Sequence, residues 1–469
     1  MTHKQDFRDK RVTVVGLGIE GVDLARYLVG EGALVTVSDS RPKERLAPRL
    51  RDLDGLPVRL SLGKNDPADV AIADHVFVSQ GVPLDIPALT LARDRGIPLD
   101  SMTRLFLDLC PGPVVGITGS SGKTTVTSLV ATMFAATGKE HVVGGNIGVG
   151  LLSLLDEITP ETWVVLEISH TQLELTTKSP HVACVLNVTP NHLDRYSWEG
   201  YVDLKRNILR YQTSDDVAVL GYDDDVSRSL ASDAHGKVVF FSMEASLPGP
   251  AALLRDDVVI WRDGPKDTPV MPTAEIPLRG RHNVANVLAA TAIASSCGIP
   301  TDAIATAVRD FGAVPHRLEL VGEVDGVAYY NDSIATTPER TLAGVRSFQE
   351  PIVLLLGGRE KHLPLGEMFR EICGRCRALV FFGEARETLV AAARTACDAI
   401  DQDKRPHIEV VDSLNDAVPA ARAAARPGDV VLLSPACTSF DSYDNFEERG
   451  EHFRRLVLTM TDREGRSLS

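Results

Sequence analysis

Lys123 and Thr124 end a glycine-rich loop inside the stretch VVGITGSSGKTTV, residues 114–126. The apolar run before the loop predicts a strand, and the periodic apolar segment after it predicts a helix. The backbone N–H groups of such a loop and the start of the helix can surround a polyphosphate. Lys123 would reach the outer phosphates, and the Thr124 hydroxyl would bind Mg²⁺. The general P-loop pattern has glycine where this chain has Ile117, so an ordinary Gly/Ser turn is the alternative interpretation.

A second group of reactive side chains follows the loop. Glu167 closes the predicted strand WVVLEIS (163–169), and a carboxylate at a strand tip near a P-loop is well placed to bind Mg²⁺. The next predicted strand (181–190) runs into His192, and the helix-like segment YVDLKRNILRY (201–211) carries Lys205. Taken alone, His192 would be a loop histidine and Lys205 a surface lysine. Asn146, in the loop GGNIG (144–148), can contact a substrate through its amide.

The N-terminal region carries a nucleotide-binding pattern. A predicted strand at 11–15 enters GLGIEG (16–21), a helix-like segment follows, and a second strand (33–39) ends at Asp39. Strand, GxGxxG, helix, strand and acid form the dinucleotide-binding fingerprint. This pattern indicates a binding site for a nucleotide or for a sugar nucleotide, and it does not distinguish the two ligands. Gly81, after the predicted strand HVFVSQG (75–81), adds another turn that could face a ligand.

Composition bounds the remaining classes of function. The chain has 469 residues, a net charge of −15 and no apolar run long enough to span a membrane. The acidic balance argues against a nucleic-acid partner. The polar N-terminus lacks the apolar core of a signal peptide. Seven scattered cysteines suit a reducing cytoplasm better than a disulfide scaffold, so we expect a cytoplasmic protein. Cys373 and Cys376 form the one CxxC motif, and the sequence has no second Cys pair or nearby His cluster that would indicate a metal site.

Strands that alternate with helices predict an α/β protein with mainly parallel sheets. The CPGP stretch at 110–113 and the segment around 310–315 predict two boundaries and thus three domains, 1–110, 111–313 and 314–469. The third region repeats the βα pattern, and its strands end in Gly, Ser or Asp, the residues that line crevices in such sheets. Between the boundaries, Asn283 and Asn286 fall three residues apart at the start of a helix-like segment. Their amides could hydrogen-bond the edge of a purine base. The alternative is that Asn283 caps the N-terminus of the helix.

These motifs, in this order, resemble the Mur ligases of peptidoglycan synthesis over nearly the whole chain. The stretches TGSSGKTT, GGNIG, LEIS, NVTPNHLDRY, YVDLK and GRHNVAN are similar to the family's ATP-binding core. The opening GLGIEG and the ending SPACTSFDSYDNFEERGEHF (434–453) resemble the MurD type, the glutamate-adding branch. The resemblance implies an N-terminal Rossmann-like domain, a central P-loop ATPase-like domain and a C-terminal Rossmann-like domain. The family's TGxxGK[ST] loop also accounts for the irregular glycine position.

The resemblance implies a set of site residues. The catalytic positions would be Lys123, Glu167, His192 and Lys205. ATP would be bound by Gly119, Ser120, Ser121, Gly122, Lys123, Thr124, Thr125, Asn283, Asn286, Arg317 and Asp332. The UDP-linked substrate would be bound by Ile19, Glu20, Asp39, Ser40, Arg41, Gly81, Asn146, Ser169 and Gln172. The amino acid would be bound by Thr336, Lys361, Ser439 and Phe446, and two Mg²⁺ ions by Thr124, Glu167, His192 and a carbamylated Lys205.

The implied reaction joins D-glutamate to UDP-N-acetylmuramoyl-L-alanine through an acyl phosphate, at the expense of ATP and with Mg²⁺. The expected protein is a cytoplasmic monomer that neither binds nucleic acid nor inserts into a membrane. Departures from the usual MurD pattern fall at Ile334 and Thr337, where Lys and Asn are usual, and at His170 and Thr171, where Ser and Phe are usual. They leave L-glutamate as an alternative, because the selectivity of a chiral pocket can turn on one or two contacts.

Three further alternatives stay open. Another Mur-family ligase, similar to folylpolyglutamate synthase, would not explain the N-terminal GxGxxG or the SPACTSFD ending. An NAD(P) oxidoreductase would explain GxGxxG and leave GSSGKTT, Glu167 and Lys205 without a purpose. A P-loop ATPase that couples hydrolysis to motion would turn over ATP without any amino acid.

Overall fold

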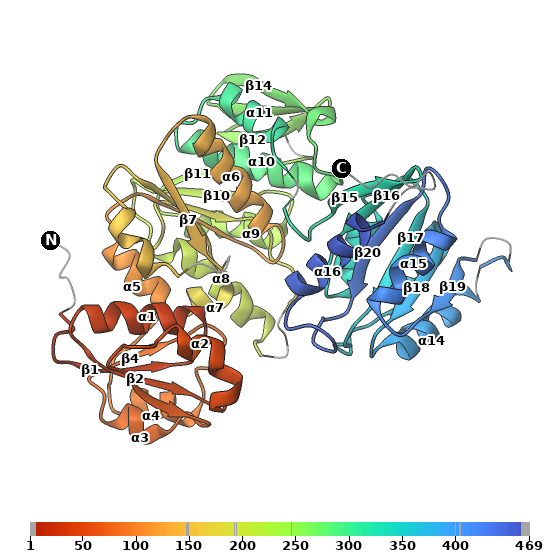
Figure 1. Cartoon of the computed structure of the whole chain (residues 1–469). Helices are drawn as coiled ribbons and strands as arrows, with labels where there is room; N and C mark the ends of the chain where they lie inside the picture. Colours follow the sequence, from red (N-terminus) through yellow and green to blue (C-terminus); the bar gives the residue numbers. More distant parts are fainter. Residues whose placement is uncertain are drawn as a thin grey trace. The chain divides into compact units, whose positions relative to one another are not determined.

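A computed structural model of the chain describes residues 6–146, 150–191, 193, 195–244, 246–312, 314–398, 400–402 and 405–460 (Figure 1). Three sheets follow one another along the sequence, with helices between their strands, which confirms the predicted α/β class with three mainly parallel sheets. The chain forms two compact units, one of Met1–Ile276 with Val284–Phe311 and one of Pro277–Asn283 with Gly312–Ser469. The first unit holds two sheets, and the second unit holds the third.

The N-terminal sheet has the order β3-β2-β1-β4-β5, with all neighbours parallel. Its strands are β1 (Arg11–Val15), β2 (Leu34–Asp39), β3 (Arg59–Leu62), β4 (His75–Val78) and β5 (Leu99–Asp100). Its helices are α1 (Ile19–Gly30), α2 (Ala47–Arg51), α3 (Pro67–Ala71), α4 (Pro87–Asp94) and α5 (Met102–Leu109). The chain crosses from one side of β1 to the other at β4, so the loops after β1, β2 and β4 converge at a topological switch point, where such sheets bind ligands.

The central sheet has the order β14-β13-β12-β11-β10-β9-β6-β8-β7. Its parallel strands are β6 (Val114–Thr118), β7 (His141–Gly145), β8 (Trp163–Glu167), β9 (Val182–Val185), β10 (Val217–Gly221), β11 (Lys237–Ser242) and β12 (Ala251–Arg255). Two antiparallel strands, β13 (Val258–Asp263) and β14 (Lys266–Pro272), extend one edge. The helices are α6 (Lys123–Ala136), α7 (His170–Leu173), α8 (Trp198–Arg210), α9 (Asp225–Ser229), α10 (Arg281–Ser296) and α11 (Thr301–Arg309). Strand β6 lies between β8 and β9, so the loops after these three strands emerge side by side.

The C-terminal sheet has the order β15-β16-β20-β17-β18-β19, with one antiparallel pair at β15 and β16. Its strands are β15 (Glu319–Val324), β16 (Val327–Asn331), β17 (Ile352–Gly357), β18 (Cys376–Phe382), β19 (His407–Val410) and β20 (Val430–Ala436). The helices are α12 (Pro338–Val345), α13 (Gly366–Arg375), α14 (Arg386–Cys397), α15 (Leu414–Ala424) and α16 (Phe446–Leu458).

Both faces of the C-terminal sheet are buried, as its unbroken apolar strands predict. In β17, Leu354 and Leu356 pack into a core with side chains of α12, α13 and α14. Val353 and Leu355 pack into a second core, which side chains of α15 and α16 complete. The period of two along an extended strand therefore divides one apolar run between two helical layers.

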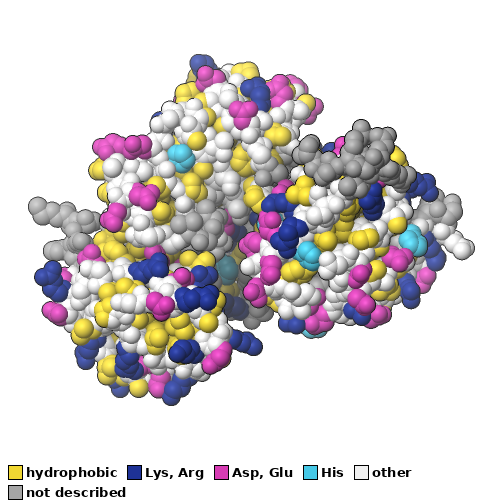
Figure 2. All heavy atoms as spheres, viewed as in Figure 1, with side chains coloured by type: hydrophobic (Ala, Val, Ile, Leu, Met, Phe, Trp, Pro, Cys, Tyr) yellow, Lys and Arg dark blue, Asp and Glu magenta, His cyan; other side chains and the backbone are white. Residues whose placement is uncertain are grey.

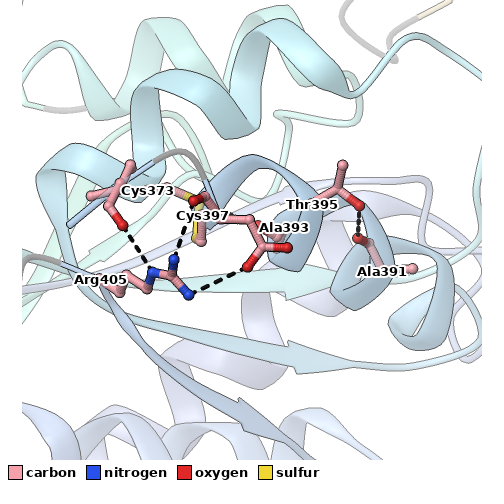
Figure 3. The surroundings of a disulfide bond; sticks show 8 residues. Cys373, Ala391, Ala393, Thr395, Cys397 and Arg405 are labelled. Carbon is pink, nitrogen blue, oxygen red and sulfur yellow. Dashed lines mark hydrogen bonds and ion pairs between the residues drawn. A yellow bond between two sulfur atoms is a disulfide. The ribbon is translucent and has the colours of Figure 1, made fainter. Parts of the chain in front are cut away.

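Cys373 of α13 and Cys397 of α14 form a disulfide bond, with their Cα atoms 5.7 Å apart (Figure 3). The sequence pattern suited a reducing cytoplasm better than a disulfide scaffold and predicted no such pair. The CxxC spacing does not give the bridge, because Cys376 is a buried free thiol on β18. The pair forms because two packed helices bring together residues that are 24 positions apart, a proximity that no local spacing reveals.

The surface carries both signs of charge. On the face drawn in Figure 2, Lys and Arg side chains are interspersed with Asp and Glu. Among the described residues, no helix combines the length and the apolar character that crossing a membrane requires.

Candidate active site

The loop after β6 folds tightly around the start of α6. Gly119 and Gly122 have φ values of +155° and +86°, which favour glycine. A Cβ atom on Gly122 would lie 2.5 Å from Oδ1 of Asn286, so a side chain at this position would collide with α10. Lys123, the first residue of α6, turns back and donates a 2.9 Å hydrogen bond from Nζ to the Gly119 carbonyl. The loop thus has the compact, N–H-rich form expected of a phosphate cradle.

Asn187, just after β9, holds this loop in shape. Its Oδ1 accepts a 2.9 Å hydrogen bond from the Ser121 N–H, and its Nδ2 donates to the Ser121 carbonyl. The backbone carbonyl of Asn187 accepts from the Ser120 N–H. The Ser120 hydroxyl lies 3.2 Å from the Tyr201 hydroxyl of α8. Sequence reasoning missed Asn187 because it placed this residue inside a longer strand, whereas β9 ends at Val185.

Glu167 ends β8, directly beside the loop strand. The side chain is 2% exposed, and Oε1 accepts a 2.8 Å hydrogen bond from Nδ2 of Asn146. The backbone N–H of Asn146 also donates to the Glu167 carbonyl, so two hydrogen bonds join these residues. The second carboxylate oxygen, Oε2, is buried and has no hydrogen-bond partner within the described residues. A buried, unsatisfied carboxylate oxygen is costly unless a cation completes it, so this atom fits a Mg²⁺ ligand.

Lys205 lies on the buried face of α8 and is 1% exposed. Its Nζ donates to the Thr118 hydroxyl at 3.0 Å and to the Gly119 carbonyl at 3.2 Å, the same carbonyl that Lys123 uses. Burial, and then the positive charge of Lys123, hold the pKa of Lys205 well below 10.5, against the opposing effect of Glu167. This lowering favours the neutral, nucleophilic form of the amine more than at a surface lysine.

At the N-terminal switch point, Asp39 organises the glycine loop. Its Oδ2 accepts a 2.7 Å hydrogen bond from the Leu17 N–H, and its Oδ1 accepts from the N–H and Nε of Arg41. Burial opposes ionisation, but the hydrogen bonds from Arg41 and Leu17 outweigh it and lower the pKa of Asp39. Asp39 is therefore an anion whose oxygens already hold the glycine loop at Leu17 and the backbone at Arg41.

Glu20 connects the N-terminal sheet to the central one. Its carboxylate accepts 2.9 Å hydrogen bonds from the Gln80 N–H and from Nε2 of Gln172. Gln172 and Ser169 form a reciprocal capping box around the short helix α7, and the Ser169 hydroxyl donates to the Gln80 side chain. Burial raises the pKa of Glu20. These three predicted residues thus form one network within the first unit, and the Glu20 side chain faces protein donors.

A pocket opens beside this network. Its lining includes Glu20 and Gln172, the glycine turn at Gly81, and Thr171 of α7. Gly81 has a φ of +91°, so the turn after β4 depends on glycine. Thr171 is one of the departures from the MurD pattern, and it lies in the pocket that also holds predicted substrate residues.

Asn283 and Asn286 both lie within α10, and both are largely buried. Asn283 is the third residue of the helix, and its Nδ2 donates to the Arg279 carbonyl at 2.7 Å. The alternative that Asn283 caps this helix is therefore wrong. Asn286, one turn further along, packs against Gly122 of the loop.

In the second unit, Asp332 follows β16 and is 5% exposed. Oδ2 accepts a 2.8 Å hydrogen bond from the Ser434 hydroxyl. Burial raises the pKa of Asp332 to about 7, against the lowering effects of this hydrogen bond and of the Arg317 charge. Arg317 and Asp332, predicted from separate motifs, thus influence one another.

The predicted amino-acid residues gather at the carboxyl ends of the C-terminal strands. Nζ of Lys361, after β17, donates to the Thr336 hydroxyl at 3.2 Å. Burial, and then the charge of Arg340, lower the pKa of Lys361. Ser439, after β20, is buried, and Phe446 begins α16. Thr336, Lys361 and Ser439 therefore follow neighbouring strands of the sheet, and Phe446 begins the helix after the last of them.

Comparisons with known proteins match all three sheets. The Mur ligase MurD-like N-terminal domain matches residues 10–100, the Mur ligase middle domain matches 117–294, and the Mur ligase glutamate ligase domain matches 316–437. A UDP-N-acetylmuramoylalanine–D-glutamate ligase of Symbiobacterium thermophilum is 42% identical and covers 96% of this chain and 98% of its own. This chain belongs to the Mur ligase family. A ligase of the same name from Acetivibrio thermocellus is 40% identical, with 97% of each chain covered.

Solved structures show the same fold. UDP-N-acetylmuramate-alanine ligase from Thermotoga maritima has a TM-score of 0.59 at 19% identity and covers 95% of this Mur ligase and 98% of its own chain. A pseudomurein peptide ligase type C from Methanothermus fervidus has a TM-score of 0.55 at 17% identity, with 96% and 99% covered. At these identities the likeness concerns the fold of a Mur ligase alone.

One predicted site residue of this Mur ligase, His192, lies outside the described residues. Thr124 and Thr125 lie in the first turn of α6, as the loop pattern predicts. The residues that sequence reasoning missed are Asn187, Tyr201 and Gln80, which hold the predicted residues through side chains. Of these three, only Gln80 could have been proposed from the sequence, because it directly precedes the glycine turn at Gly81.

Proposed function

We propose that this Mur ligase joins D-glutamate to the carboxylate of UDP-N-acetylmuramoyl-L-alanine, with ATP as the energy source, in peptidoglycan precursor synthesis. Relatives that carry the corresponding name are 37–42% identical over nearly the full length. One structural observation supports the chemistry. The loop lysine Lys123, the carboxylate of Glu167 and the buried amine of Lys205 come from the ends of adjacent strands and the helix packed on them.

In the proposed first step, the alanine carboxylate of the substrate attacks the γ-phosphorus of ATP, and ADP leaves. The product is an acyl phosphate. The N–H groups of residues 119–125 and the Lys123 ammonium would stabilise the phosphate charge as it shifts toward the leaving oxygen. Lys123 can do so by releasing its hydrogen bond to the Gly119 carbonyl. Asn283 and Asn286 of α10, with Arg317 and Asp332, would hold the remainder of ATP.

The residues around Glu167 fit divalent cations. Oε2 of Glu167 is the buried oxygen that needs a partner, and Thr124, His192 and a carbamylated Lys205 would complete the two proposed Mg²⁺ sites. Bound Mg²⁺ would supply charge neutralisation for the phosphates. Carbamylation of Lys205 is supported by its low pKa and burial, because only a neutral amine attacks CO₂. Asn146 would keep Oε1 of Glu167 occupied and so orient Oε2.

In the proposed second step, the amine of D-glutamate attacks the acyl carbon, inorganic phosphate leaves, and the amine loses a proton. Thr336, Lys361, Ser439 and Phe446 would hold the amino acid. Lys361 is well suited to a carboxylate, because its ammonium group is already oriented by a hydrogen bond to Thr336. We assign these roles to the residues as proposals.

The UDP-linked end would bind at the switch point of the N-terminal sheet. Because the Glu20 carboxylate faces Gln80 and Gln172, we propose that its backbone N–H, at the start of α1, faces the diphosphate. Ile19, Asp39, Ser40, Arg41, Gly81, Asn146, Ser169 and Gln172 would complete this site. The domain boundaries at 110/111 and 313/314, a monomeric state and a cytoplasmic location remain parts of the proposal.

The test is phosphate release from ATP with UDP-N-acetylmuramoyl-L-alanine and either D-glutamate, L-glutamate or no amino acid. We expect release that depends on both the nucleotide substrate and D-glutamate, with the dipeptide product detected by mass. Equal release without any amino acid would identify an ATPase instead. Stimulation by L-glutamate alone would keep the ligase and reverse the stereochemistry.

A further inference from the structure

Arg449 is the largest fully buried side chain among the described residues. It projects from the first turn of α16, where its guanidinium is 0% exposed, and it carries a positive charge into the interior of the second unit. Burial lowers its pKa to about 10, so it stays protonated at neutral pH. A buried charge usually requires an ion-pair partner or a function.

The guanidinium uses all its donors on the protein. Nε donates to the Ser333 hydroxyl at 3.0 Å, and Nη2 donates to the Ser333 carbonyl at 2.8 Å. Nη1 donates to the Gly357 carbonyl, and both Nη1 and Nη2 donate to the Cys437 carbonyl. No carboxylate of the described chain hydrogen-bonds this guanidinium, so its charge is solvated by dipoles and not cancelled by a contact ion pair.

The acceptors belong to the ends of three neighbouring strands. Ser333 follows β16, Gly357 ends β17 and Cys437 follows β20, in a sheet where β20 lies between the other two. These are the loops that lead to Thr336, Lys361 and Ser439. Ser333 also donates from its hydroxyl to the Phe446 carbonyl at 2.8 Å. One side chain therefore connects every segment that carries a proposed amino-acid residue.

Three cations, Arg340, Lys361 and Arg449, influence one another at this edge of the sheet. Arg340 and Arg449 both lower the pKa of Lys361 and Glu339 opposes them, although burial is the largest cause. The largest opposing influence on the pKa of Arg449 is the charge of Asp441, whose Oδ2 accepts a hydrogen bond from the Glu384 N–H. An incoming ligand with two carboxylates can pair with more of these cations than a ligand with a single carboxylate.

We propose that Arg449 is a positioning and specificity-determining residue of the amino-acid pocket, which locks three strand ends together and favours a dicarboxylic amino acid over a neutral one. The inference rests on the proposed function and deepens it. In this role Arg449 contacts neither ATP nor the reacting atoms. It acts by holding the three loops in place and by contributing a positive charge near the amino acid.

The test compares Arg449→Lys and Arg449→Met with the exposed control Arg455→Met on the same helix. We expect Arg449→Lys to raise the KM for D-glutamate about tenfold, while kcat and the KM for ATP change less than about threefold. Arg449→Met should also lower the preference for D-glutamate over D-glutamine about tenfold, because the charge is lost. The control should match the unchanged protein.

Ser333→Ala weakens the hydrogen bonds that join Arg449 to the loops but leaves the charge of Arg449 in place. It also provides a test if an Arg449 variant does not fold. It removes one acceptor of Arg449 and the link to Phe446, while the guanidinium remains. We expect a KM for D-glutamate about threefold higher with an unchanged preference over D-glutamine. Folded Arg449 variants with an unchanged KM and an unchanged preference would overturn the proposal, as would Ser333→Ala with an unchanged KM.

Failure of the proposed function and failure of the role of Arg449 give different results. If the proposed function is wrong, the unchanged protein shows no glutamate-dependent phosphate release. If only the present inference is wrong, the unchanged protein is active and the Arg449 variants keep its amino-acid kinetics. A merely structural arginine would raise the KM values of ATP, the nucleotide substrate and glutamate together, and this result would also overturn the inference.

Discussion

Asn146 donates a 2.8 Å hydrogen bond to one carboxylate oxygen of Glu167, and the other oxygen of that buried carboxylate has no hydrogen-bond partner within the described residues. The two oxygens of one side chain therefore have different surroundings. One is fixed by an amide from the end of β7, and the other is directed to a site that a cation can complete. This asymmetry would give the loop after β7 an influence on the proposed Mg²⁺ site.

Removing the Asn146 amide should weaken Mg²⁺ binding. In Asn146→Ala, Oε1 of Glu167 loses its donor and the carboxylate is free to rotate, so the Mg²⁺ concentration for half-maximal activity should rise about tenfold. Glu167→Gln, which loses the anion itself, should lower kcat by at least about a hundredfold. Phosphate release at graded Mg²⁺ measures both effects. Asn415→Ala, on the exposed face of α15, is the control, and an equal Mg²⁺ response in all variants would contradict the role.

Lys205→Ala should reduce kcat by at least about a hundredfold, because it removes a buried amine whose pKa is lowered by burial and by the Lys123 charge. If the amine works as a carbamate, acetate or propionate should restore part of the activity by filling the space with a carboxylate. Phosphate release with and without these acids measures the rescue. Arg210→Ala, exposed at the end of the same helix, should stay fully active. A Lys205→Ala protein with full activity would remove this residue from the mechanism.

Gly122→Ala should abolish tight nucleotide binding. The substitution puts a side chain at positive φ and 2.5 Å from Oδ1 of Asn286, so the loop or α10 must move. The matched control is Gly138→Ala, after the other end of α6, which has a φ of +66° and nothing within 4 Å of the new Cβ. Titration with a fluorescent ATP analogue should show at least about a tenfold loss of affinity for Gly122→Ala only. Equal affinities would contradict the proposed packing role.

Asp332 should make the second unit less stable as the pH rises from about 4 to about 7. Its pKa is raised from 3.8 to about 7 by burial, so the folded state holds a proton that the unfolded state releases in this range. Asp332→Asn removes this dependence and should raise the free energy of unfolding above pH 7 by at most about 4 kcal/mol, with no gain below pH 4. Hydrogen–deuterium exchange of β16 and α12 at several pH values measures it. The exposed Asp412→Asn is the control, and a gain that does not grow with pH would contradict the assignment.

The Cys373–Cys397 bridge should be detectable as a linked peptide pair in protein purified without reductant. It closes a loop of 24 residues, so its loss in Cys373→Ser with Cys397→Ser should lower the free energy of unfolding of the oxidised protein by about 3 kcal/mol. Peptide mapping and urea unfolding with and without reductant measure this. The double variant and the reduced protein should behave alike. A bridge between Cys373 and Cys376 in the peptide map would contradict the pairing.

Much of the fold was predictable because its strands are short apolar runs with clear ends. The strands at Arg11–Val15, Lys237–Ser242 and Val430–Ala436 coincide with runs visible in the sequence. The start of α10 was harder, because its first residues, Arg281 to Asn283, are polar and resemble a loop. Its helical state comes from packing of the apolar residues that follow.

The site was predictable where one local motif supplies several contacts. Lys123 and Gly122 lie where the loop pattern puts them. Contacts between distant segments were not predictable, because spacing says nothing about which strand ends meet. Asn187, 66 residues from Ser121, and Arg449, 116 residues from Ser333, became visible only once the sheet order was known.

The second unit recruits Pro277–Asn283 from the middle of the chain, and this segment supplies Arg279. The Arg279 guanidinium lies over the rings of Tyr330 and Phe348 and pairs with Glu350 at 2.8 Å. A fragment that starts at residue 314 would expose those rings and leave Glu350 without its cation. An exchange of the C-terminal region between two relatives would therefore have to carry this second, separate segment as well.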